Sequence, residues 1–173
     1  MLSLILGGAR SGKSRYAEQC ALDSGKNVVY IATATAGDAE MQERIDRHKI
    51  DRPGHWQTLE EPVGLGRLLA EQASEERCLL VDCLTLWLSN VLFDAQGNIR
   101  ETLFTLEREA LLESLLDIPG QVILVSNEVG SGVIPMGAAT RRYVDEAGRL
   151  HQDLAQLSDR VVLVTAGLPQ ILK

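Results

Sequence analysis

The 173-residue sequence predicts an α/β fold, in which a doubly wound, mostly parallel sheet carries helices on both faces. Short apolar segments rich in β-branched residues alternate along the chain with segments of helical periodicity. The apolar segments lack clear polar/apolar alternation, as is typical of strands buried on both faces of a parallel sheet. No linker, repeat or low-complexity stretch interrupts this order, so we predict one domain that spans residues 1–173.

The individual strands and helices follow from these two patterns. Six segments are predicted as strands: Leu2–Leu6, Val28–Ala32, Trp56–Leu59, Leu79–Asp82, Val122–Val125 and Val161–Val164. After the first strand, Ala17, Cys20 and Ala21 recur at helical spacing and predict an amphipathic helix. Two later helices are predicted from apolar positions, namely Leu103, Leu106, Ala110 and Leu111 in one and Val144, Ala147, Leu150 and Leu154 in the other. The segment Leu84–Phe93 is apolar on every side and predicts a helix buried between the sheet and a neighbouring element.

The first predicted strand runs directly into the sequence GGARSGKS. This segment fits G-x-x-x-x-G-K-[ST], with Gly7, Gly12, Lys13 and Ser14 in the fixed positions. The glycines allow backbone N–H groups to surround phosphate oxygens, and the following helix adds the positive end of its dipole. Lys13 is expected to reach the β- and γ-phosphates, and the Ser14 hydroxyl to bind Mg²⁺. An ordinary glycine-rich turn is the alternative, but the strand and helix around the loop favour a nucleotide site of the P-loop NTPase type.

Polar residues also follow other predicted strands. Asp82 ends an apolar strand, and a carboxylate there is expected to hold Mg²⁺ directly or through water, although it could instead cap the next helix. Thr33 and Thr35 follow one strand, and Asn127 and Glu128 follow another. Ligands of such sheets bind beyond the carboxyl ends of the strands. These four side chains therefore either line the site or satisfy hydrogen bonds in turns.

Composition and charge limit the classes of partner. With 45% hydrophobic residues, the chain is able to bury a substantial core. The net charge of −7 argues against a nucleic-acid surface, which needs a clustered basic face. Cys20, Cys78 and Cys83 form no C-x-x-C pair and predict buried thiols in a reducing compartment. Because the first residues lead at once into the glycine-rich loop, no signal peptide is expected, and no apolar run approaches the ~18 residues of a membrane span. A cytoplasmic location is therefore expected.

A basic cluster, RIDRHKIDRPGHW, spans residues 44–56. Met41, Ile45 and His48 fall on one face of a helix that is predicted to begin after the cap Asp38. His48 is either a core histidine or a functional one. Neighbouring cations favour the neutral form of its ring, and a neutral imidazole is able to attack phosphorus. His55 is expected to be exposed. Trp56 is expected to begin a strand and to pack on the core.

The sequence also excludes some classes of P-loop protein. A signalling GTPase would need the guanine-recognition motif N-K-x-D, which the sequence lacks. The D-x-x-G at Asp145–Gly148 lies within a helical pattern and is not read as a GTPase motif. A small-molecule kinase or a nucleotidyltransferase remains.

Five segments, in this order, resemble the bifunctional adenosylcobinamide kinase/adenosylcobinamide-phosphate guanylyltransferase family of cobalamin assembly: GGARSGKSRYAE, YIATA, R-I-x-x-H-K-x-x-R-P-x-x-W, LLVDCLTLWLSN and VSNEVGSGVIP. The resemblance covers essentially the whole chain. It implies that a corrinoid hydroxyl is phosphorylated by ATP or GTP, and that GMP is then transferred from GTP through a GMP–histidine intermediate on His48. It also implies a homotrimer.

The resemblance implies a set of nucleotide contacts: Gly7, Gly8, Ala9, Arg10, Ser11, Gly12, Lys13, Ser14, Thr33, Ala34, Thr35, Lys49, Ile50, Asp51, Arg52, Glu60 and Asp82. Two departures from the family pattern, His151 in place of a common Asn and V-I-P in place of I-V-P, concern the corrinoid contacts. Two alternatives stay open. One is a P-loop small-molecule kinase without guanylyl transfer, and the other is a non-catalytic nucleotide-binding regulator.

Overall fold

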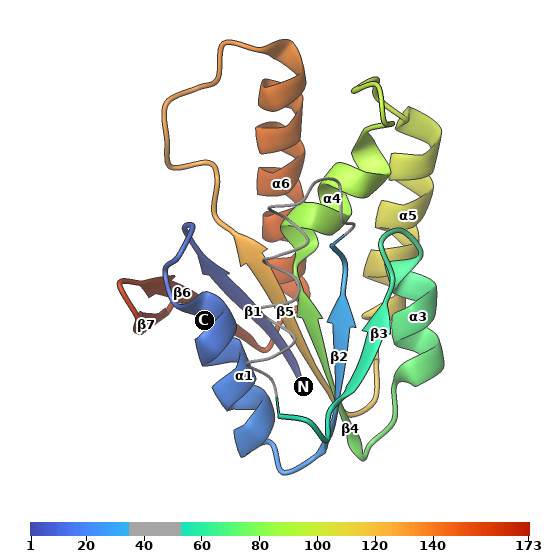
Figure 1. The fold of residues 1–173 in the computed structure, drawn as a ribbon, viewed down its shortest axis with the longest axis vertical. Coiled ribbons are helices and arrows are strands. Elements are labelled where there is room, and N and C mark those ends of the chain that lie inside the picture. The colour runs from blue at the N-terminus through green and yellow to red at the C-terminus, as the bar shows by residue number, and fades with distance from the viewer. Residues whose placement is uncertain (35–52) are drawn as a thin grey trace.

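The protein is built on one seven-stranded sheet (Figure 1). The structure, a computed structural model, describes residues 1–34 and 53–173. The strands are β1 (Leu2–Gly7), β2 (Asn27–Ala32), β3 (Gln57–Glu60), β4 (Arg77–Asp82), β5 (Gln121–Asn127), β6 (Arg160–Thr165) and β7 (Leu168–Ile171). Their order in the sheet is β3-β2-β4-β5-β1-β6-β7. Strands β1 to β6 pair in parallel, and β7 runs antiparallel to β6.

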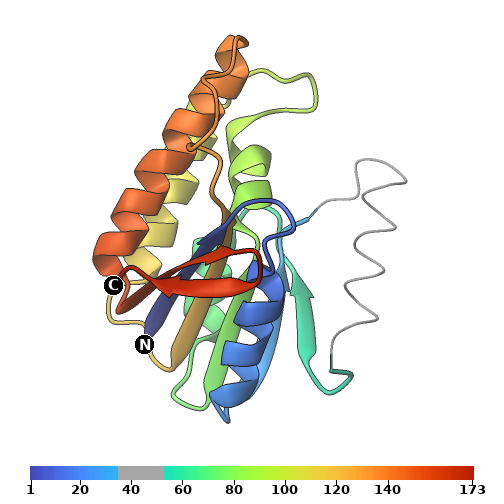
Figure 2. The ribbon, with the colours of Figure 1, turned by 90° about the vertical axis from the view of Figure 1, so that its left-hand side faces the viewer.

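Helices cover both faces of this sheet, as the sequence predicts. The helices are α1 (Lys13–Asp23), α3 (Leu65–Gln72), α4 (Leu84–Leu92), α5 (Glu101–Ser114) and α6 (Ala138–Leu157). Figure 2 shows α1 on one side of the sheet and α5 and α6 on the other. The buried residues of α3 and α4 belong to the same core as those of α5 and α6. The predicted fold class is therefore confirmed.

Two apolar cores explain why the strands read as continuous apolar runs. On β1, Leu2 and Leu4 pack in the larger core with four helices, whereas Ile5 packs in the smaller core with α1. On β5, Leu124 faces the larger core and Val125 the smaller one. Because both faces of each inner strand are covered, neither face needs polar residues.

The predicted strands all have counterparts, but each differs from the observed strand by one or two residues at one end or both. The segment Trp56–Leu59 was predicted as a strand, whereas β3 begins one residue later, at Gln57. Trp56 lies in the preceding turn, where its backbone N–H donates to the Pro53 carbonyl at 3.0 Å. Its side chain is buried in the core beneath α1, as expected, and His55 is exposed.

The sequence patterns did not predict β7 or α3. The chain reverses between β6 and β7 at Ala166 and Gly167, whose φ angles are 53° and 79°. Two consecutive residues with positive φ make the type of two-residue turn that suits a hairpin. Pro169 lies in β7, and an edge strand tolerates proline because one side of the strand has no partner.

Helix α4 confirms the prediction of a buried apolar helix. Trp87 and Leu88 are almost fully buried, and the Trp87 indole N–H donates to the Val63 carbonyl at 2.7 Å. The prediction for α5 was correct in type but wrong in one detail. Leu106 is 61% exposed, whereas Phe104 and Leu111 supply the buried face.

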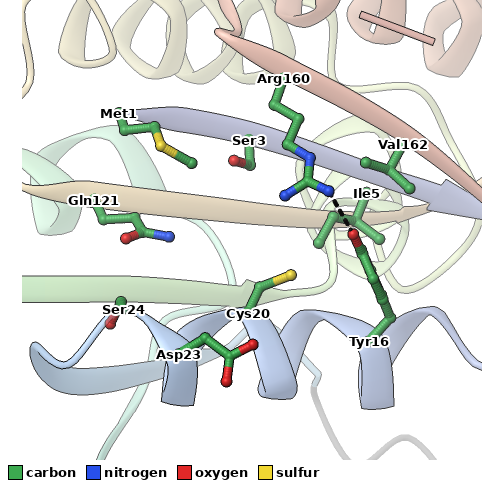
Figure 3. A pocket seen from close by; sticks show the side chains of 10 residues that line it. All are labelled: Met1, Ser3, Ile5, Tyr16, Cys20, Asp23, Ser24, Gln121, Arg160 and Val162. Atoms are coloured by element: carbon green, nitrogen blue, oxygen red, sulfur yellow. Dashed lines mark hydrogen bonds between the residues drawn. The ribbon is translucent and has the colours of Figure 1, made fainter. Parts of the chain in front are cut away.

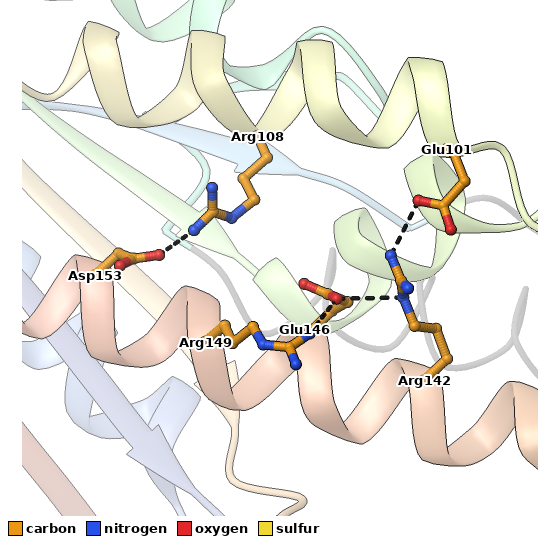
Figure 4. Close-up of polar contacts among 6 residues, drawn as sticks. All are labelled: Glu101, Arg108, Arg142, Glu146, Arg149 and Asp153. Atoms are coloured by element: carbon orange, nitrogen blue, oxygen red, sulfur yellow. Dashed lines mark hydrogen bonds and ion pairs between the residues drawn. The ribbon is translucent and has the colours of Figure 1, made fainter.

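Ion pairs join α6 to α5 along their length (Figure 4). The carboxylate of Glu146 is buried and lies 2.5 Å from the Arg149 guanidinium and 3.2 Å from that of Arg142. Arg142 also reaches Glu101 on α5 at 2.9 Å, and Arg108 of α5 pairs with Asp153 of α6. A buried carboxylate needs such partners because an unpaired charge is costly to bury. These contacts fix α6, whose side chains reach the candidate site.

Helix α3 packs unusually close to α5, and Gly66 makes this possible. A Cβ atom on residue 66 would lie 2.5 Å from the Ala110 carbonyl carbon and oxygen. We therefore expect Gly66→Ala to lower the free energy of unfolding by about 1–3 kcal/mol, because backbone atoms must move apart. Urea denaturation measures this change.

Gly148→Ala is the matched control for this prediction. Gly148 also lies in a helix, but a Cβ atom there meets nothing within 4 Å. Alanine should be neutral there or stabilise by up to ~1 kcal/mol, because it favours helix more than glycine does. Equal effects at both positions would contradict the close packing of α3 on α5.

Candidate active site

Three adjacent parallel strands, β4, β5 and β1, end at the same edge of the sheet. Asp82 ends β4, Asn127 ends β5 and Gly7 ends β1. Gly7 and Asn127 are register partners, and the Glu128 N–H donates to the Gly7 carbonyl at 3.0 Å. The carboxyl edge of a doubly wound sheet is where ligands of such folds bind. The candidate site is therefore built around these strand ends.

The glycine-rich loop connects β1 to α1 in a conformation that its glycines permit. A Cβ atom on Gly7 would lie 2.4 Å from the Ser11 hydroxyl oxygen and 2.6 Å from the Val164 carbonyl oxygen. Gly12 has a φ of 94°, which a residue with a Cβ rarely adopts. The Gly167 N–H donates to the Ser11 carbonyl at 2.8 Å, so the turn between β6 and β7 supports the loop.

Lys13 begins α1 and folds back over the loop. Its ammonium donates to the Gly8 carbonyl at 3.1 Å, and the residue is 9% exposed. Gly8, Ala9, Arg10 and Gly12 are exposed around it, and Ser14 is half-buried on the first turn of α1. The Ser11 hydroxyl is buried and has no hydrogen-bond partner within the described part of the chain. The loop thus offers a cation and an unused polar group beside exposed backbone.

Residues in β2 and directly after it hold Asp82 and the following residue, Cys83. The Tyr30 hydroxyl donates to Asp82 Oδ2 at 3.1 Å. Thr33 is fully buried; its hydroxyl donates to the Cys83 carbonyl at 2.6 Å and accepts from the Cys83 N–H at 2.9 Å. The structure therefore gives the Thr33 side chain a supporting role, in which it fixes the turn after Asp82.

The pKa of the Cys83 thiol depends on its burial and on the charges of Asp82 and Lys13. Burial raises the pKa of its thiol, the Asp82 carboxylate raises it further, and the Lys13 ammonium opposes both. Lys13 is therefore within electrostatic range of the residue that follows Asp82. Burial also raises the pKa of the Cys78 thiol, to about 11. Both thiols are protonated at neutral pH, and Cys78, Cys83 and the half-buried Cys20 are free.

A hydrogen-bonded cluster supports the end of β5. The Thr85 hydroxyl accepts from the Asn127 N–H at 2.7 Å and lies 3.4 Å from the Ser126 hydroxyl. Ser126 in turn lies 2.7 Å from His151 Nε2 on α6. Sequence patterns did not predict roles for Thr85 or Ser126, although the polar residues S-N-E after an apolar strand were the signal available. The expected link between His151 and a corrinoid is untested, and this contact gives the ring a partner inside the protein.

The stability of the protein should depend on the charge of His151. Burial lowers the pKa of this ring, and Glu128 only partly opposes the shift. The unfolded chain takes up a proton near pH 6.5, whereas the folded ring stays neutral to lower pH. The free energy of unfolding should therefore fall as the pH falls below about 6.5.

Urea denaturation at several pH values between 7.5 and 5 measures this dependence. The matched variant His151→Gln keeps a polar group near Ser126 but does not titrate. Its stability should fall less steeply with pH than that of the unsubstituted protein. Equal slopes would show that His151 does not contribute.

Several predicted site residues lie outside the described residues or away from the loop. His48, Thr35, Lys49, Ile50, Asp51 and Arg52 lie outside the described ranges. Ala34 is half-buried shortly after β2. Glu60 is exposed at the carboxyl end of the edge strand β3, and β2 separates β3 from β4.

A cavity of about 240 Å³ lies elsewhere, between α1 and strands β1, β5 and β6 (Figure 3). Arg160 and Tyr16 point toward each other within it, and the guanidinium donates to the Tyr16 hydroxyl at 2.8 Å. None of the predicted site residues that the structure describes lines this cavity. Within residues 1–34 and 53–173, no group of three or more His, Cys, Asp or Glu side chains is placed to hold a metal ion. None of the helices in these ranges combines the length and apolar character that a membrane crossing needs.

Comparisons with known proteins agree along the whole chain. A family model described as cobinamide kinase / cobinamide phosphate guanyltransferase matches residues 3–172. The chain is 57% identical over 173 residues to the bifunctional adenosylcobalamin biosynthesis protein CobP of Pseudomonas aeruginosa, covering 100% of this chain and 98% of the relative. It is 38% identical over 177 residues to the corresponding protein CobU of Escherichia coli strain K12, covering 97% of each chain. Among solved structures, the RadB recombinase is similar in fold alone, with a TM-score of 0.52 and 16% identity over 94% of this chain and 73% of that one.

Proposed function

Because the chain belongs to the cobinamide kinase / cobinamide phosphate guanyltransferase family, we propose that it catalyses both reactions of that name on one domain, residues 1–173. It is an enzyme, a kinase and nucleotidyltransferase that uses nucleotide substrates. In the first reaction, the aminopropanol hydroxyl of adenosylcobinamide attacks the γ-phosphate of ATP or GTP. In the second, GMP passes from GTP to the new corrinoid phosphate, which gives adenosylcobinamide-GDP. The observation that carries this proposal is the family match over residues 3–172.

The phosphate loop supports the use of one apparatus for both reactions. Each reaction is an in-line displacement at phosphorus, which needs positioning and neutralisation of oxygen charge more than covalent chemistry. Lys13 is already held over the loop by Gly8, and the exposed loop backbone surrounds it. We therefore assign phosphate binding to Gly7–Ser14, with Lys13 as the catalytic cation.

Ser14 and Asp82 are the residues proposed to hold Mg²⁺. Their hydroxyl and carboxylate oxygens are the hard donors that this ion prefers, and phosphate oxygens and water would complete its shell. Tyr30 fixes the Asp82 carboxylate by a bond to one of its oxygens. When bound, the ion would neutralise developing charge on the phosphate oxygens.

His48 is the proposed nucleophile of guanylyl transfer. Its ring would attack the α-phosphorus of GTP as the bond to pyrophosphate breaks, and the corrinoid phosphate would then take GMP from the ring. A covalent intermediate divides a transfer between two anions into two easier steps. The proposed nucleotide contacts further include Thr33–Thr35, Lys49–Arg52 and Glu60.

The proposed function comes with a proposed quaternary structure and a proposed location in the cell. We infer a homotrimer and a cytoplasmic location from the family resemblance and from the three free thiols. The net charge of −7 supports small substrates over nucleic acid. Sedimentation of the purified protein measures its oligomeric state.

Incubation with GTP labelled at the α-phosphate tests the proposed function. Covalent label that is stable in base and lost in mild acid supports guanylyl transfer through histidine. Transfer of γ-phosphate to cobinamide without covalent label supports a kinase alone. A protein that binds GTP and does neither would be a nucleotide-dependent regulator.

A further inference from the structure

We propose that Asn127 is a catalytic residue of the kinase reaction, in which its side-chain amide orients the attacking hydroxyl against the γ-phosphate. This inference rests on the proposed function, because it assigns a residue to one half of that function.

Asn127 occupies the centre of the candidate site. Its strand, β5, lies between β1, which leads into the phosphate loop, and β4, which ends at Asp82. Asn127 pairs in register with Gly7, the first residue of the loop, and β5 continues two residues beyond the partner of Asp82. The end of β5 therefore lies between the strand that leads into the proposed phosphate loop and the strand that ends at the carboxylate proposed to bind metal.

The Asn127 side-chain oxygen is buried but accepts no hydrogen bond within the described part of the chain. A buried amide oxygen without a hydrogen-bond partner lowers the stability of the fold by about 1–3 kcal/mol. Such atoms are therefore rare unless a ligand or a water molecule donates a hydrogen bond to them. The Ser11 hydroxyl, in the phosphate loop, has the same property. Both unpaired atoms belong to residues near Gly7. Asn127 is the register partner of Gly7, and the Ser11 Oγ atom would lie 2.4 Å from a Cβ atom built on Gly7.

The neighbouring residues already have partners inside the protein. The Asn127 N–H donates to Thr85, and Ser126 contacts both Thr85 and His151, which fixes the backbone on either side of the strand end. The Glu128 carboxylate accepts from the N–H groups of Gly130 and Ser131, at 2.7 and 3.2 Å, and so holds its own loop. Of Ser126, Asn127 and Glu128, Asn127 at the end of β5 is therefore the one that keeps a side-chain oxygen without a partner, available to a substrate.

The chemistry of an amide fits this task. Its oxygen accepts a hydrogen bond from a hydroxyl, and its nitrogen donates one to a phosphate oxygen, so one side chain is able to hold nucleophile and electrophile together. The new bond joins the hydroxyl oxygen to the γ-phosphorus as the bond from phosphorus to the β–γ bridging oxygen breaks. The hydroxyl proton passes to water, and the nucleoside diphosphate leaves. Asn127 takes no proton itself, which suits a loose transition state that needs orientation more than a strong base.

Asn127→Ala tests the proposal through both half-reactions. We expect kcat for cobinamide phosphorylation to fall by about 10², the loss that a misplaced reactant causes. Covalent self-labelling by GTP should continue at a similar rate, because its nucleophile and its target phosphorus are different. GTP affinity, measured by calorimetry, should change by less than about threefold, since only the kinase geometry is lost.

Two variants serve as controls. Asn27→Ala removes the same side chain from an exposed strand terminus at the opposite edge of the sheet, and it should change neither reaction. Glu128→Gln tests the neighbouring carboxylate as a general base. A kinase loss in Glu128→Gln with full activity in Asn127→Ala would overturn the proposal, as would equal losses of both half-reactions in Asn127→Ala. If the unsubstituted protein phosphorylates no cobinamide, the proposed function fails instead, and the two failures are thus distinguishable.

Discussion

Lys13→Ala is expected to weaken cobinamide phosphorylation and guanylyl transfer together, each by about 10² or more in kcat/KM. The ammonium lies over the phosphate loop and donates to the Gly8 carbonyl, and Lys13 as a whole residue is 9% exposed. A cation in this position would neutralise phosphate charge that both proposed transition states share. Steady-state assays of each half-reaction measure the effect.

The control for Lys13 is Arg15→Ala. Arg15 lies two residues further along α1 and is exposed, so its loss removes a cation without touching the loop. Both activities should stay within about twofold, because screened surface charge contributes little. If Lys13→Ala abolished one activity and spared the other, two separate nucleotide sites would be needed.

His48→Asn is expected to abolish covalent GMP and guanylyl transfer, while most cobinamide phosphorylation survives. Asparagine is polar and of similar reach but forms no phosphoramidate with GMP. The kinase reaction uses the substrate's own hydroxyl and does not need the imidazole. Labelling with GTP that carries the isotope at the α-phosphate, followed by peptide mapping, measures the result.

The pH dependence and a control variant sharpen this prediction. The yield of label should fall as the pH drops below about 6.5, because only the neutral imidazole attacks phosphorus. His55→Asn, which removes an exposed histidine from the same basic cluster, should leave labelling unchanged. GMP found on His55 or Lys49 would overturn the assignment to His48. Parallel losses of stability and of both activities would indicate a core histidine.

The phosphate loop and the strand pattern could be predicted because their signals are local. The motif GGARSGKS places every essential residue within eight consecutive positions; a Cβ atom at Gly7 would clash, and Gly12 has a positive φ. Strands covered on both faces read as apolar runs wherever they occur. The helix at Leu84–Phe93 was predicted on the same principle, since a helix that is apolar all round must be buried.

Features that depend on distant partners were not predicted. Leu106 has the right spacing for a buried position, yet α5 turns it to solvent because Phe104 and Leu111 fill the space against the neighbouring elements. Helix α3 contains a glycine, which argues against helix when read alone, but the backbone of α5 lies too close for any Cβ atom at Gly66. Strand β7 is short and contains a proline, so only its pairing with β6 identifies it.

The sequence by itself identified the family, and it predicted the phosphate loop with Lys13 and Ser14, because these signals lie in contiguous motifs. It predicted Asp82 from its place at the end of an apolar strand. It left open whether Thr33 or Asn127 lines the site, since both are polar residues after apolar strands. The tertiary structure distinguishes their side chains. Strand order places Asn127 beside Gly7 with a free acceptor, whereas the Cys83 backbone occupies the Thr33 hydroxyl. Strand order and register come from contacts between segments far apart in the chain, and no local pattern encodes which strand ends will meet.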